Sequence, residues 1–118
     1  MKAIKKVREL IKKFVLTFKS IKNIHLFVFD FLGLLKNKDI IYKTRDGLKI
    51  IARAGTSDSA EIIIIHSGLE YPKKYFPKRK RPIIVDLGSH IGSFALYAYK
   101  KLYILNPKIY AVEPSLIN

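Results

Sequence analysis

The chain contains no cysteine among its 118 residues, and this absence removes several classes of function. Without cysteine there is no disulfide framework, no thiolate nucleophile and no cysteine-ligated metal. The histidines, His25, His66 and His90, are far apart in the sequence and have no carboxylate at ligand spacing, so we expect no metal site. The sequence also lacks the G-x-S-x-G elbow of hydrolases and the P-loop of nucleotide triphosphatases.

Long apolar runs are missing as well. The longest apolar stretch, Leu26 to Leu35, is interrupted by Asp30 and is too short to span a bilayer. Lysines recur through the N-terminal region instead of preceding a single apolar core, so the pattern of a secretory signal is absent. A cytoplasmic location is therefore the default expectation.

Acidic residues are scarce: 9 Asp and Glu stand against 23 Lys and Arg, which gives a formal net charge of +14. Such an excess raises nucleic acid or an anionic membrane as a partner. Lysine and isoleucine are abundant throughout the chain, however, and a composition bias produces the same charge without a dedicated partner. We therefore do not expect specific nucleic-acid binding. A small basic binding module, for nucleic acid or an anionic membrane surface, is the alternative to an enzyme.

Residues 1–37 form the first of three segments, a basic arm with a helical pattern from Lys2 to about Leu35. Lysines occupy the other faces of this helix, while apolar side chains recur at three- and four-residue spacing: Ile4, Val7, Ile11, Phe14, Val15, Phe18 and Ile21. In one interpretation, residues 1–35 adsorb peripherally to an anionic membrane. In the other, which we favour, the apolar stripe packs on the domain and the lysines remain in solvent.

Residues 38–82 form the second segment, which begins with a β-hairpin. The runs 40–45 and 48–53 are rich in apolar and β-branched residues and flank Asp46-Gly47. This pair tolerates positive φ and closes tight two-residue turns between strands. The sequence therefore predicts an antiparallel pair of strands here.

The rest of the second segment gives mixed signals. Asp58 and Glu61 form the pattern of a helix capping box, whereas the run 62–65 is β-branched and favours a strand. The stretch 71–82 is basic, aromatic and punctuated by proline, a mixture that could hold single-stranded nucleic acid through phosphate contacts and stacking. Pro82 directly before an apolar run favours a solvated linker instead.

Residues 83–118 form the third segment and carry the most informative pattern of the chain. An apolar run that ends at Asp86 leads into a turn with Gly88 and Gly92, a helical pattern follows, and Glu113 ends the next apolar run. The order of strand, glycine turn, helix, strand and acid is that of the first half of a nucleotide-binding α/β unit. We therefore expect a β-α-β unit with a ligand at its glycine turn.

The identity of the nucleotide can be argued from charge. The dinucleotide fingerprint G-x-G-x-x-G places pyrophosphate on amides at a helix N-terminus, but here His90 stands where the second glycine would be. Asp86, two residues before the first glycine, would repel pyrophosphate and suits a ligand that carries an ammonium and a sulfonium. S-adenosylmethionine is such a ligand.

The residues from Val85 to Tyr97 resemble motif I of the FkbM-type S-adenosylmethionine-dependent methyltransferases, and Ala111-Val112-Glu113-Pro114 resembles their acidic second-strand motif. Upstream, the stretch 53–58 and the pair Glu70-Tyr71 match elements that precede motif I in that family. The family commonly has asparagine where this chain has His90. Both side chains form hydrogen bonds, so the resemblance holds.

This resemblance, which runs from about Ile40 onward, implies an α/β fold: the N-terminal part of a Rossmann-like class I methyltransferase sheet, preceded by the basic arm and the hairpin, with a short helix between. It implies S-adenosylmethionine as cofactor and a hydroxyl of a sugar, lipid-linked or secondary-metabolite molecule as methyl acceptor. A sheet of this class needs several more strands after Glu113, so we expect either a truncated chain or one whose remaining strands come from a partner, and in both cases a chain that is inactive by itself. The sequence assigns no catalytic base and no oligomeric state.

The resemblance also implies roles for individual residues. Gly88 would let the backbone approach the methionine arm, Asp86 would orient its amino group, and Glu113 would accept hydrogen bonds from both ribose hydroxyls. Gly92 would permit close packing of helix and strand. The expected cofactor-binding set is Asp86, Gly88, Ser89, His90, Gly92, Glu113 and Tyr71.

Overall fold

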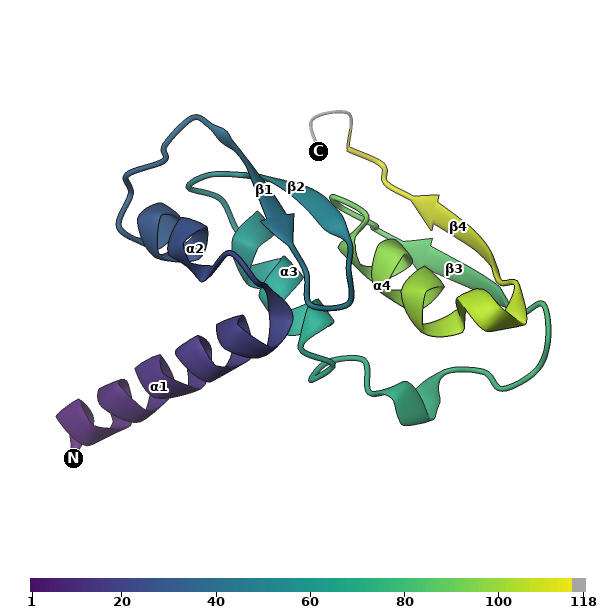
Figure 1. Cartoon of the computed structure of the whole chain (residues 1–118), viewed down its shortest axis with the longest axis horizontal. Coiled ribbons are helices and arrows are strands. Elements are labelled where there is room, and N and C mark those ends of the chain that lie inside the picture. The colour runs from purple at the N-terminus through teal and green to yellow at the C-terminus, as the bar shows by residue number, and fades with distance from the viewer. Residues whose placement is uncertain (116–118) are drawn as a thin grey trace.

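The computed structural model describes residues 1–115 and shows a mixed α/β chain (Figure 1). Two helices, an antiparallel hairpin and a third helix come first, and a parallel β-α-β unit follows. In the hairpin, β1 (Asp39–Lys43) pairs with β2 (Lys49–Arg53); in the second sheet, β3 (Ile83–Leu87) pairs with β4 (Lys108–Val112). The fold is therefore α/β, as expected.

The predicted single helix in the N-terminal arm is wrong, because the structure has α1 (Lys2–Ser20) and α2 (Ile24–Phe31). The chain leaves α1 at Ile21, which takes an extended conformation (φ −123°, ψ 155°) and forms an isolated antiparallel bridge with Thr44. Ile21 is completely buried there. Burial of this side chain and its pairing with the hairpin outweigh the local preference for a continued helix.

Most of the apolar stripe of α1 does not pack on the domain, so the interpretation we favoured for the arm is wrong. Val7, Ile11 and Phe18 are 58%, 59% and 60% exposed, whereas Thr17 and Ser20 are buried. At roughly 100° of rotation per residue, the Phe18 and Ser20 side chains leave the helix about 200° apart. The stripe therefore faces away from the body, from which the N-terminal part of α1 projects (Figure 1).

The joint between α1 and α2 is held by hydrogen bonds to the rest of the fold. The Ser20 hydroxyl donates to the carbonyl oxygen of Ile63 (2.7 Å), and the Ser20 carbonyl accepts from the backbone N–H of Arg45 (2.9 Å). The Asn23 side-chain oxygen accepts from the backbone N–H of Lys43 at the end of β1 (2.9 Å). These bonds fix the direction in which α1 leaves the hairpin.

The hairpin forms as predicted, with Tyr42 opposite Ile50. Exposed and buried side chains alternate along both strands, as in a sheet with one covered face. The turn is longer than the expected two-residue turn, because the backbone N–H of Thr44 donates to the carbonyl of Leu48 (2.9 Å) and closes a wider loop. The covered face contributes to the core, whose buried residues are Ile21, Ile40, Tyr42, Ile50, Ala52, Ala54 and Ile62.

The third helix, α3 (Asp58–His66), confirms the short helix despite its run of isoleucines. It buries Ile62, Ile63 and Ile65 and lies against α1 and β2. The predicted capping box is wrong: Ser57 is the N-cap residue and makes no side-chain cap hydrogen bond. Tertiary contacts of the acidic side chains, described below, replace the expected cap.

Residues 67–82 lead from α3 to β3 and contain one short 3₁₀ turn, η1 (Lys73–Tyr75). The lysines and arginines of this segment are exposed, and Pro82 at its end is buried. Phe76, however, stacks on Phe94 with ring centroids 6.4 Å apart. This packing favours a linker tied to the domain over a free stacking surface for nucleic-acid bases.

The predicted β-α-β unit is confirmed, with β3 and β4 parallel and α4 (Ser93–Leu102) between them. A 3₁₀ turn, η2 (Tyr103–Leu105), and a left-handed Asn106 (φ +54°) bring the chain back to β4. Ile84 and Asp86 are half-buried on one face of this sheet. The other face is open among the described residues, where the exposed side chains are Ile83, Val85, Leu87, Tyr110 and Val112.

Candidate functional site

The predicted cofactor loop lies at the carboxyl end of β3, before α4. Gly88, His90 and Gly92 all take left-handed conformations, with φ of +75°, +51° and +76°. The backbone N–H groups of Gly88 and Ser89 both donate to the carbonyl of Val112 (2.8 and 3.1 Å), which holds the loop against the end of β4. Left-handed backbone favours glycine, so the two glycines are required by the turn itself.

A side chain added at Gly88 or Gly92 would meet no other atom within 4 Å. The expected role of Gly92 in close packing of helix and strand is therefore wrong, because only its φ requires glycine. At Gly88 the free space is where the resemblance places the methionine arm of the cofactor.

Glu113 follows β4 and reaches back to the cofactor loop. Its Oε2 accepts a hydrogen bond from the backbone N–H of His90 (2.6 Å), and its Oε1 accepts one from the backbone N–H of Ser115 (2.8 Å). Both carboxylate oxygens therefore accept backbone hydrogen bonds, one from the loop itself and one from the residues that follow β4. The acid thus lies beside the glycine turn, as the spacing predicts.

The His90 imidazole lies between two carboxylates of α3. Its Nδ1 is 2.5 Å from Glu61 Oε2, and its Nε2 is 3.3 Å from Asp58 Oδ1. Asp58 is completely buried, and its Oδ2 accepts hydrogen bonds from both the backbone N–H and the Nε of Arg53 (2.9 Å each). Through this network Arg53 of β2 and the first turn of α3 are tied to the cofactor loop.

The carboxyl groups around the loop have pKa values that are shifted in opposite directions. Burial alone would raise the pKa of Asp58, but hydrogen bonds from Arg53 and Thr56 outweigh it and lower the pKa to about 2. Burial raises the pKa of Glu61 and of Asp86. Asp86 Oδ2 is buried and has no hydrogen-bond partner among residues 1–115. A cation beside Asp86 would compensate for this burial.

Tyr71 stands at the side of this site. Its ring packs on that of Phe94, with centroids 4.4 Å apart. Burial, and then the neighbouring carboxylates of Glu70 and Asp86, raise the pKa of Tyr71, which indicates that the acidic groups lie near its hydroxyl. A small cavity of about 180 Å³ opens beside the ring, and its lining includes Tyr71, Tyr75, Ile84 and Phe94.

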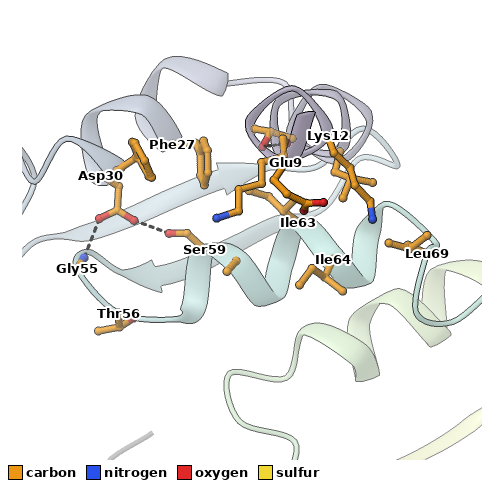
Figure 2. Close-up of a pocket in the computed structure, with 15 residues that line it drawn as sticks. Glu9, Lys12, Phe27, Asp30, Gly55, Thr56, Ser59, Ile63, Ile64 and Leu69 are labelled. Atoms are coloured by element: carbon orange, nitrogen blue, oxygen red, sulfur yellow. Dashed lines mark hydrogen bonds between the residues drawn. The ribbon is translucent and has the colours of Figure 1, made fainter. Parts of the chain in front are cut away.

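A second cavity, of about 460 Å³, lies between α1, α2 and α3 (Figure 2). Its lining contains none of the predicted cofactor residues. Asp30 at its edge is bonded through both oxygens: Oδ1 accepts from the backbone N–H of Gly55 (2.7 Å) and Oδ2 from the hydroxyl of Ser59 (2.6 Å). These bonds fix α2 to the start of α3, which gives Asp30 a structural role.

Comparison of the chain with models of known protein families, with curated proteins and with solved structures finds no match. In the described part of the chain, no group of three or more His, Asp or Glu side chains is arranged to hold a metal ion. No helix within residues 1–115 has the length and apolar character needed to cross a membrane. The geometry of the loop and the motif resemblance therefore carry the functional argument.

The structure brings six of the predicted site residues together around one loop and leaves Tyr71 beside it: the six are Asp86, Gly88, Ser89, His90, Gly92 and Glu113. Sequence reasoning missed the contribution of Arg53 and Glu61 to this loop. The stretch from Arg53 to Asp58 did resemble the methyltransferase family, but its residues were interpreted locally as a turn and a helix cap. That resemblance was the signal that could have found Arg53, whereas Glu61 lies outside the stretch and had no such signal.

The stability of the chain is expected to fall as the solution is acidified. Burial alone would raise the pKa of Asp46 and of Asp58. Hydrogen bonds outweigh burial, chiefly from His66 to Asp46 and from Arg53 to Asp58, and lower both pKa values to about 2. The unfolded state takes up protons near pH ~4 while the folded state does not, so the stabilisation is complete above that pH and is lost as the pH falls through ~2. Melting temperatures from circular dichroism across this range test the prediction. An Asp58→Asn variant should show a smaller change, and a flat profile for the native chain would contradict it.

Proposed function

We propose that the chain forms the cofactor-binding part of an S-adenosylmethionine-dependent O-methyltransferase with a Rossmann-like class I sheet. One observation carries the proposal: the left-handed glycine turn after β3 lies between Asp86, with its buried unpartnered oxygen, and the Glu113 carboxylate that follows β4. In open α/β sheets, ligands bind at the carboxyl ends of parallel strands. The resemblance to motif I of the FkbM-type family supports the same cofactor.

The charge of the site supports a cationic ligand. The chain as a whole carries a formal net charge of +14, yet four carboxylates lie around the loop, those of Asp58, Glu61, Asp86 and Glu113, against the single guanidinium of Arg53, which pairs with Asp58. An anionic pyrophosphate would be repelled by this arrangement, whereas a sulfonium and an ammonium would be attracted. This local reversal of sign favours S-adenosylmethionine over a dinucleotide.

Each residue has a definite task in the proposal. Bound S-adenosylmethionine supplies an electrophilic methyl group, and its transfer to a hydroxyl oxygen depends mainly on positioning. The carboxylate of Glu113 accepts hydrogen bonds from the ribose hydroxyls, Asp86 pairs with the ammonium, and the backbone at Gly88 lies against the methionine arm. The resemblance, rather than the residues of this chain, implies the acceptor: a hydroxyl of a sugar, a lipid-linked molecule or a secondary metabolite.

Titration with S-adenosylmethionine, followed by nuclear magnetic resonance, tests the proposal even if affinity is weak. The amide signals of residues 88–92 and of Glu113 are expected to shift at millimolar cofactor, because these groups form the loop that contacts it. ATP shares the adenosine but carries phosphates, so it should shift them less. An Asp86→Asn variant, similar in size, should weaken the response to S-adenosylmethionine. Absent shifts at the loop, or equal shifts with ATP, would contradict the proposed function.

A further inference from the structure

Helix α1 presents an apolar stripe to solvent and a polar face to its own domain. Ile4, Val7 and Ile11 are 75%, 58% and 59% exposed. The opposite side of the helix packs on α3, where Thr17 and Ser20 are buried. A helix that only completed a core would have the reverse arrangement. Among the described residues, the Arg45 guanidinium contacts the stripe at Phe18, 4.4 Å from the ring centroid, whereas Ile4, Val7 and Ile11 remain open to solvent.

Basic side chains flank this stripe on both sides. Seven Lys and Arg and a single acidic residue, Glu9, lie between Lys2 and Ser20. With roughly 100° of rotation per residue, Arg8 and Lys19 follow Val15 at one edge of the stripe, and Lys6 lies about 40° beyond Leu10 on the other side. All three basic side chains are exposed. An apolar face bordered by cations along both edges is the arrangement of helices that lie in the plane of an anionic bilayer surface.

The apolar surface continues from α1 onto α2. Leu10 and Phe14 of α1 line a shallow cleft together with Phe27 and Phe31 of α2. Phe31 is 67% exposed, and its ring stacks on Phe27. Because the body of the protein lies on the other side of α1, this surface can meet a flat boundary without a clash with α3.

We propose that α1, with the adjoining end of α2, docks the protein on an anionic lipid bilayer. Charge complementarity selects this occupant over a second copy of the chain. Two copies joined stripe to stripe would place the same cations against each other along both edges, at a cost in repulsion. Anionic headgroups neutralise these cations while the acyl boundary takes up the stripe. The inference is independent of the methyltransferase proposal, because it uses none of the residues of the cofactor loop.

The absence of tryptophan from the chain allows a site-specific test. Ile11→Trp places a single fluorophore on the stripe, and Ile51→Trp places one on the hairpin at a residue of matched exposure, 59% against 61%. Vesicles of phosphatidylcholine with phosphatidylserine should shift the emission of Ile11→Trp to the blue and leave that of Ile51→Trp unchanged. Vesicles of phosphatidylcholine alone should shift neither. Equal shifts in both variants, or a shift with neutral vesicles, would overturn the proposal.

Co-sedimentation with the same vesicles measures the contributions of the stripe and of its cations. Ile11→Asn is expected to weaken binding roughly tenfold or more, because the isoleucine side chain that the bilayer would bury is lost. The control Ile51→Asn should leave binding unchanged. Lys6→Gln should weaken it roughly fivefold, the contribution of one lysine near an anionic surface. Failure of the native chain to bind, or a solution dimer that Ile11→Asn dissociates, would overturn the proposal.

Discussion

Replacement of Asp58 by alanine is expected to lower the free energy of unfolding by about 1–3 kcal/mol, the range for leaving a buried hydrogen-bonding group without its partner. Asp58 is completely buried and accepts hydrogen bonds from the backbone and side chain of Arg53. Alanine would remove the acceptor of the Arg53 backbone N–H and the carboxylate that pairs with the guanidinium. The same change would free His90 from one of its two carboxylates.

Urea unfolding followed by far-ultraviolet circular dichroism measures this loss. Asp58→Asn is the matched control, because the amide keeps the volume and one acceptor oxygen while removing the charge. It should cost less than Asp58→Ala. Glu70→Ala, at an exposed residue, should be close to neutral. A loss below about 1 kcal/mol for Asp58→Ala would show that the hydrogen bonds between Asp58 and Arg53 contribute little.

Replacement of Glu113 by alanine is expected to weaken S-adenosylmethionine binding by about 1–3 kcal/mol, the range for removing hydrogen bonds to a charged group. Two effects act together. The carboxylate that would accept hydrogen bonds from the ribose hydroxyls is lost. The His90 backbone N–H also loses its acceptor, Glu113 Oε2, which lies 2.6 Å from the nitrogen. Titration calorimetry or the magnetic resonance titration described above supplies the affinity.

Glu113→Gln separates these two effects. Glutamine keeps one oxygen to accept from the backbone of His90 but cannot accept from the loop and from both ribose hydroxyls equally well. We expect an intermediate loss of affinity with the loop signals unperturbed in the free protein. Unchanged affinity in Glu113→Ala would refute the assignment of ribose recognition to this residue.

Elements with strong local signals were predicted correctly from the sequence. The hairpin follows from β-branched runs on both sides of Asp46-Gly47, and the β-α-β unit follows from the glycine turn at Gly88. Contacts between distant segments were not predicted. Helix α1 ends where Ile21 pairs with Thr44, and the helical periodicity of the arm does not indicate this pairing. Tertiary contacts of this kind override local propensity.

In the candidate site too, local spacing was predictive and contacts between distant segments were not. The spacing of Asp86 and Glu113 was sufficient to place them at neighbouring strand ends, because parallel strands present their carboxyl ends at one edge. The network from Arg53 through Asp58 to His90 joins residues on separate elements, and nothing in their spacing indicates it. The orientation of the α1 stripe was also unpredictable, because periodicity gives the face of a helix but not the direction in which that face points.

The hydrogen bonds of Ser20 and Asn23 hold α1 at one angle to α3 and the hairpin. A hinge there would let the arm take any angle to the body. The fixed corner instead transmits the orientation of the arm to everything beyond it, including the loop at Gly88. A chain resting on a bilayer through α1 would therefore hold that loop at one height and one tilt above the lipid. Under the proposed methyltransferase function, only acceptors whose hydroxyl reaches that height would meet the loop.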